Sequence, residues 1–87
     1  MKNPYAPTKN ERIVAGIGRK LMEISATMPM KGLSNDEIAR SNRMSSFGDA
    51  LTRFGTTFGP KTLEDVLKLS GVSKKEAEEF MKLGYTS

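Results

Sequence analysis

Three short stretches with the form of a helix-capping box divide this chain into helical segments. In each one, a Ser or Thr is followed three positions later by Glu: Thr8–Glu11, Ser34–Glu37 and Ser73–Glu76. Such a pair can satisfy two of the N–H groups that a helix N-terminus leaves without acceptors. No run of β-branched residues alternates with polar ones, so no sheet is expected. The fold class predicted is all-α, a compact bundle of four to five short helices.

Apolar spacing places these helices along the chain. Residues at steps of three and four predict a first helix over about 9–27, in which Gly16 and Gly18 indicate close packing against another backbone, with a weak turn as the alternative. A second helix is expected over about 35–42 and a third over 47–54, with one unbroken helix over 35–54 as the alternative. Further helices are expected from Thr62 to Gly71 and from Ser73 to Gly84, since glycine commonly ends a helix.

The length of 87 residues allows one domain. Residues 1–7 contain two prolines and no periodicity, which predicts a flexible arm before a single helical domain over 8–87. The apolar positions of the predicted helices define the expected core: Val14, Ile17, Leu21, Ile24, Ile38, Phe47, Leu51, Phe54, Leu63, Val66, Leu67, Phe80 and Met81.

The composition argues against catalysis, metal binding and membrane insertion. The chain has no His and no Cys, which removes the usual general base, the usual nucleophilic thiolate and nearly all zinc, haem and iron–sulfur ligands. We therefore expect no enzyme activity, no metal and no cofactor. No uncharged stretch is longer than seven residues, the length of 24–30, which is far shorter than a spanning helix. The N-terminus lacks the apolar segment of a secretion signal, so a cytoplasmic protein is expected.

The positive charge lies in the first two thirds of the chain. Lys and Arg number 14 against 10 Asp and Glu, a net charge of +4. Residues 1–60 hold nine basic and five acidic side chains, including every Arg, whereas residues 61–87 are neutral. Because Arg is suited to bidentate contact with phosphate or guanine, DNA is one expected partner. The alternative is that the charge only keeps a small protein in solution.

Residues 34–55 resemble the helix-turn-helix of bacterial DNA-binding regulators. The pair Ile38-Ala39 followed by Met44-Ser45 has the order of that motif, although Arg43 stands where a turn glycine is usual and Asp49 where an apolar residue is usual. A second helix in the major groove is what this resemblance implies. It assigns the following residues to DNA: Arg40 and Arg43 near phosphates, and Ser45, Ser46, Phe47 and Arg53 toward the groove.

Residues 69–85 resemble a helix-hairpin-helix motif. Leu69, Gly71, Ala77 and Gly84 fall at the spacing of that family, and Ser73 replaces its second hairpin glycine. The resemblance implies that backbone N–H groups of the hairpin hold a DNA phosphate without reading sequence, with Lys74 and Lys75 in support. The alternative is that Gly71 and Ser73 are only helix caps, which the nearby acidic residues favour.

Two functions remain open from the sequence. The first is a small basic DNA-binding regulator of transcription acting as a homodimer. The second is a helical adaptor or inhibitor that binds a larger protein. The six Met and the aromatic residues expected to be exposed are suited to such a protein interface. Candidate dimer surfaces are Leu63, Val66 and Leu69, or the side of the first helix that carries Gly16 and Gly18.

Overall fold

The computed structural model describes residues 9–27 and 32–86, and these form four helices with no strand. They are α1 Lys9–Thr27, α2 Asn35–Thr52, α3 Leu63–Ser70 and α4 Lys74–Thr86. The all-α class predicted from the sequence is confirmed. The predicted arm over residues 1–7 lies outside the described residues, as does Thr8 of the first capping box.

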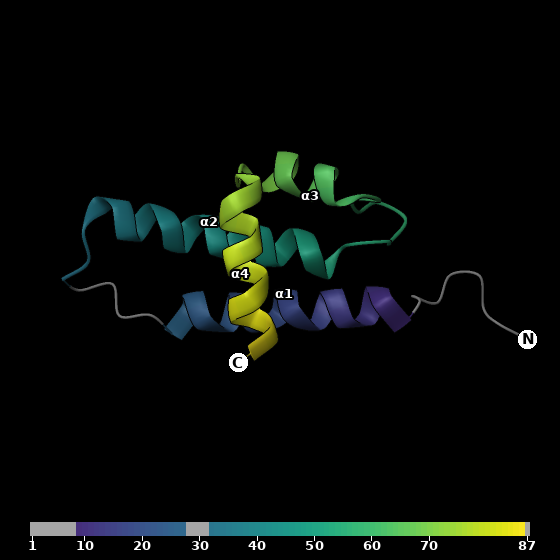
Figure 1. The fold of residues 1–87 in the computed structure, drawn as a ribbon, viewed down its shortest axis with the longest axis horizontal. Coiled ribbons are helices and arrows are strands. Elements are labelled where there is room, and N and C mark those ends of the chain that lie inside the picture. The colour runs from purple at the N-terminus through teal and green to yellow at the C-terminus, as the bar shows by residue number, and fades with distance from the viewer. Residues whose placement is uncertain (1–8, 28–31, 87) are drawn as a thin grey trace, which may run out of the picture.

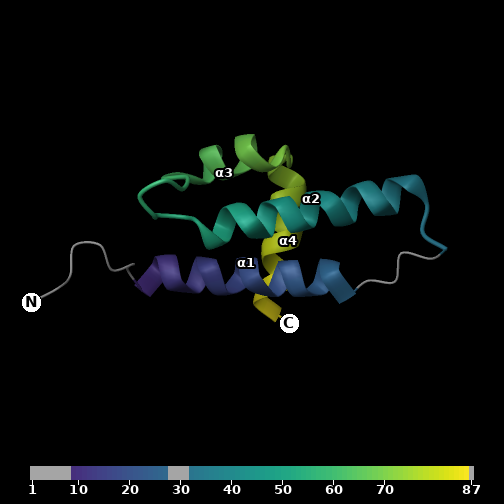
Figure 2. The same cartoon turned by 180° about the vertical axis from the view of Figure 1, so that it is seen from behind.

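Helices α1 and α2 lie side by side and antiparallel, α3 lies along the other edge of α2, and α4 crosses the α1–α2 pair steeply (Figure 1). Seen from behind, α1 and α2 cover α4 (Figure 2). The core lies where α4 crosses the pair. Its fully buried large side chains come from all four helices: Leu21, Phe47, Leu51, Val66 and Phe80.

The α1–α2 contact is built on two glycines that face each other. A Cβ on Gly18 would lie 2.5 Å from the Gly48 carbonyl oxygen, and one on Gly48 would lie 2.6 Å from the Gly18 carbonyl oxygen. Only bare backbone allows the two helices to approach this closely. The close packing predicted at Gly18 is confirmed. The same prediction for Gly16 is wrong, because nothing lies within 4 Å of a Cβ built there.

Helix α2 runs without interruption from residue 35 to residue 52, which corrects the expectation of two helices with a turn near Arg43. The capping box at its start forms in full. The Glu37 N–H donates to Ser34 Oγ and the Ser34 N–H donates to Glu37 Oε1, both at 3.2 Å. Met44 and Phe47, near the expected turn, are buried. Continuous burial along one face favours one long helix over a break.

Helix α4 passes through Gly84 and ends at Thr86, so the predicted stop at Gly84 is wrong. A Cβ on Gly84 would lie 2.7 Å from Ile17 Cγ2, which makes this glycine a contact between α4 and α1. The core prediction also needs correction at Leu63, which is 56% exposed at the start of α3, and Ile38 lies only half-buried. Met44, Ala50 and Val72 belong to the core in addition.

Candidate nucleic-acid interface

The hairpin between α3 and α4 is short and held by its backbone. Gly71 ends α3 with φ 67° and ψ 26°, the left-handed conformation that glycine adopts readily. The N–H groups of Gly71 and Val72 both donate to the Leu67 carbonyl, at 2.9 and 3.3 Å. Val72 is buried and fixes the hairpin to the core. The structure therefore shows at Gly71 the helix cap that was expected as the alternative to a helix-hairpin-helix motif.

Ser73 caps α4, but the reciprocal half of the predicted capping box does not form. The Glu76 N–H donates to Ser73 Oγ at 3.2 Å and the Ala77 N–H donates to the Ser73 carbonyl at 2.8 Å. The hydrogen bonds of this turn do not involve the N–H groups of Lys74 and Lys75. Both residues are exposed and stand at the positive end of the α4 dipole.

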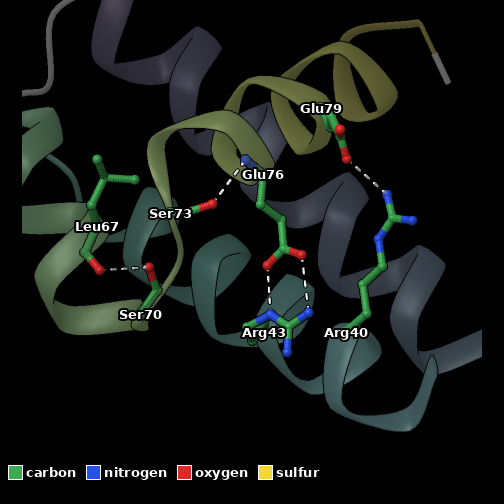
Figure 3. Close-up of polar contacts among 7 residues, drawn as sticks. All are labelled: Arg40, Arg43, Leu67, Ser70, Ser73, Glu76 and Glu79. Atoms are coloured by element: carbon green, nitrogen blue, oxygen red, sulfur yellow. Dashed lines mark hydrogen bonds and ion pairs between the residues drawn. The ribbon is translucent and has the colours of Figure 1, made fainter. Parts of the chain in front are cut away.

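The Glu76 carboxylate turns away from the hairpin and binds Arg43 on α2 (Figure 3). Arg43 Nε donates to Glu76 Oε1 at 2.5 Å and a terminal nitrogen donates to Oε2 at 3.0 Å, a bidentate arrangement. These hydrogen bonds lower the pKa of Glu76 below its ordinary value and raise that of Arg43. The negative charge closest in sequence to Lys74 and Lys75 is thus paired within the protein.

The other two Arg residues assigned to DNA also make ion pairs within the chain. Arg40 lies 3.4 Å from Glu79 and its guanidinium stands 5.6 Å from the centre of the Phe80 ring. Arg53, the C-cap of α2, lies 3.3 Å from Asp49 in the last turn of that helix. Both pairs are exposed, so each contributes little to stability.

The structure separates the predicted DNA-binding residues into two groups. Arg40, Arg43, Ser45 and Ser46 lie along one continuous α2, Arg53 is its C-cap and Phe47 lies in the core, so no separate recognition helix presents them. Lys74 and Lys75 stand together at the hairpin and make no ion pair with the described residues. The two groups thus lie on different elements, α2 and the start of α4.

Sequence reasoning missed two features of this region. Arg43 and Glu76 are 33 positions apart, and the capping-box pattern assigns Glu76 to Ser73 instead. The second feature is an apolar groove of about 500 Å³ between α3 and α4. Leu63 was expected in the core but forms part of its wall. A helix of only eight residues gave too little periodicity to distinguish the core face from the groove face.

Residues 9–27 and 32–86 thus form a small all-α domain whose α3–α4 hairpin is closed by backbone hydrogen bonds. Comparisons with protein-family models, with curated proteins and with solved structures found no match for this chain. Across residues 9–27 and 32–86, no helix is long and apolar enough to cross a membrane. The same residues include no group of three or more carboxylates placed to hold a metal ion.

Proposed function

We propose that this protein binds the phosphate backbone of DNA through the hairpin between α3 and α4, as a small regulatory protein of the cytoplasm. The carrying observation is the pairing of Glu76 with Arg43, which removes the nearest carboxylate from the first turn of α4. Lys74, Lys75 and the N–H groups of that turn then offer positive charge and hydrogen-bond donors to an anion.

Binding of this kind does not read base sequence. The hairpin supplies backbone donors and two Lys side chains, which suit phosphate oxygens, whereas base recognition needs side chains that reach the groove edges. Of the Arg residues suited to guanine, Arg43 is held by Glu76 through two hydrogen bonds, and Arg40 and Arg53 make exposed pairs with Glu79 and Asp49. We expect affinity of about 10⁻⁴ to 10⁻⁶ M at physiological salt, the usual range for non-specific binding.

Fluorescence anisotropy with a random-sequence duplex at several salt concentrations tests the proposal. Each phosphate neutralised adds about −0.9 to the slope of log affinity against log salt, so Lys74→Gln with Lys75→Gln should flatten the slope by about 1 to 2. The matched control is Arg12→Gln with Arg19→Gln, which removes the same charge from exposed positions of α1. Equal effects of the two double variants, or no binding of the wild type at low salt, would refute the hairpin site.

A second function, binding to a larger protein as an adaptor or inhibitor, is favoured by one observation. Phe58 is fully exposed at the tip of the loop between α2 and α3. The loop is tied by the Gly55 N–H, which donates to the Pro60 carbonyl at 2.9 Å. An aromatic side chain on a constrained loop is a suitable interface anchor. This function requires that the wild type captures a protein partner and that Phe58→Ser loses it. It also requires that the wild type shows no affinity for DNA at low salt.

A further inference from the structure

The groove between α3 and α4 is an apolar surface that the chain itself leaves open. Its walls are Leu63 and Leu67 of α3 and Ala77 and Met81 of α4, and Phe47 of α2 forms its floor. Leu63 is 56% exposed although the other four are buried or half-buried. Exposed leucine beside an open apolar groove costs solvation free energy unless a partner covers both.

The rim of the groove carries charges that have no partner within the described part of the chain. Glu64 stands on α3, and Lys74, Glu78 and Lys82 follow one another at four-residue spacing on α4. The ion pairs of the structure involve other residues. Two negative and two positive charges give the rim no net charge, which is unsuited to a strongly acidic or strongly basic partner.

We propose that the groove is the interface with a second copy of this chain, related by a two-fold axis. When two α4 helices lie antiparallel, the order of residues along one helix is the reverse of the order along the other. Glu78 of each copy can therefore face Lys82 of the other. A two-fold interface needs such self-complementary charge, and the rim provides it. The exposed Leu63 of each copy then enters the apolar region of the other.

This interface replaces the other dimer surfaces considered from the sequence. Val66 is fully buried within the chain, and Gly18 is occupied by Gly48. Leu69 is 69% exposed but lines a separate hollow with Phe58, away from the groove. The inference does not depend on DNA binding, because dimer formation is measured without DNA and the hairpin is tested through the salt slope.

Sedimentation velocity over a range of protein concentrations tests the interface. The wild type should form a dimer, and Leu63→Lys should weaken the association at least about tenfold, because it places charge in the apolar groove. Leu69→Lys is the matched control, with the same substitution at a site of the same helix that is 69% exposed, and should leave the dimer intact. Circular dichroism confirms that both variants fold. A monomeric wild type, or equal effects of the two variants, would overturn the proposal.

Charge exchange tests the pairing itself. Glu78→Lys and Lys82→Glu should each weaken the dimer about tenfold, since each converts two attractive contacts into repulsive ones. The double variant, Glu78→Lys with Lys82→Glu, restores opposite charges and should return to within about threefold of the wild type. A double variant as weak as the singles, or single variants that dimerise like the wild type, would exclude this arrangement of α4 helices.

Discussion

Arg43 and Glu76 connect α2 to α4 across the outside of the core. Glu76 would complete the capping box of its own helix, but the guanidinium offers two charge-assisted hydrogen bonds in place of one from a backbone N–H. The half-buried setting of the pair strengthens this preference, because water competes less for the carboxylate. A residue suited to bind phosphate is therefore committed to holding α4 on α2.

The lowered pKa of Glu76 predicts a pH dependence of stability. A carboxyl whose folded pKa lies below its unfolded value stabilises the protein above the unfolded value, near 4.5, and this contribution is lost as the pH falls through the folded pKa. Glu76→Gln should lower the free energy of unfolding by about 1 kcal/mol at neutral pH and by much less at about pH 3. Urea unfolding of both proteins at the two pH values measures this. A difference that stays constant with pH would contradict the pairing.

At the scale of elements, the fold depends on how closely α1 and α2 approach. Gly18 and Gly48 bring the two backbones together, and Leu21 and Leu51, one turn further along, fill the core beside them. Glycine inside a helix lowers its stability by roughly 1 kcal/mol relative to alanine. Here that cost is offset by packing that no larger residue allows.

Alanine substitutions separate the two kinds of glycine in α1 and α2. Gly48→Ala should destabilise the protein by about 1 to 3 kcal/mol, because the new methyl group meets the Gly18 carbonyl oxygen. Gly16→Ala should stabilise it by up to about 1 kcal/mol, since space is open there and helix propensity rises. Denaturant unfolding gives both values. Equal stability of the two variants would mean that the helices do not meet at Gly48.

The sequence predicted local structure better than it predicted contacts between helices. The bounds of α1, the Ser34 capping box and the stop at Gly71 follow from residues close in sequence. The continuity of α2 could not be decided that way, because Ser45 and Ser46 resemble a cap. What decides it is the burial of Met44 and Phe47 against other helices.

Across the whole molecule, the candidate site also combines a local feature that the sequence predicted with contacts between helices that it did not. The hairpin at Gly71–Ser73 was found from its spacing, since a turn is a local feature. The pairing of Arg43 with Glu76 and the groove beside Leu63 depend on how α2, α3 and α4 meet. The count of charges along the chain predicted that residues 1–60 bind DNA. In the structure, three of the five Arg residues in that region are paired with carboxylates of the same chain.

In the proposed function, DNA phosphate binds at the hairpin and not along α2. Titration of the isotope-labelled protein with a short random-sequence duplex, followed by amide chemical shifts, distinguishes the two sites. We expect the largest shifts on residues 71–76, around the start of α4, and we expect them to diminish as salt is added. The exposed face of α2 around Arg40 should change little. Largest shifts along α2, or no shifts at low salt, would refute binding at the hairpin.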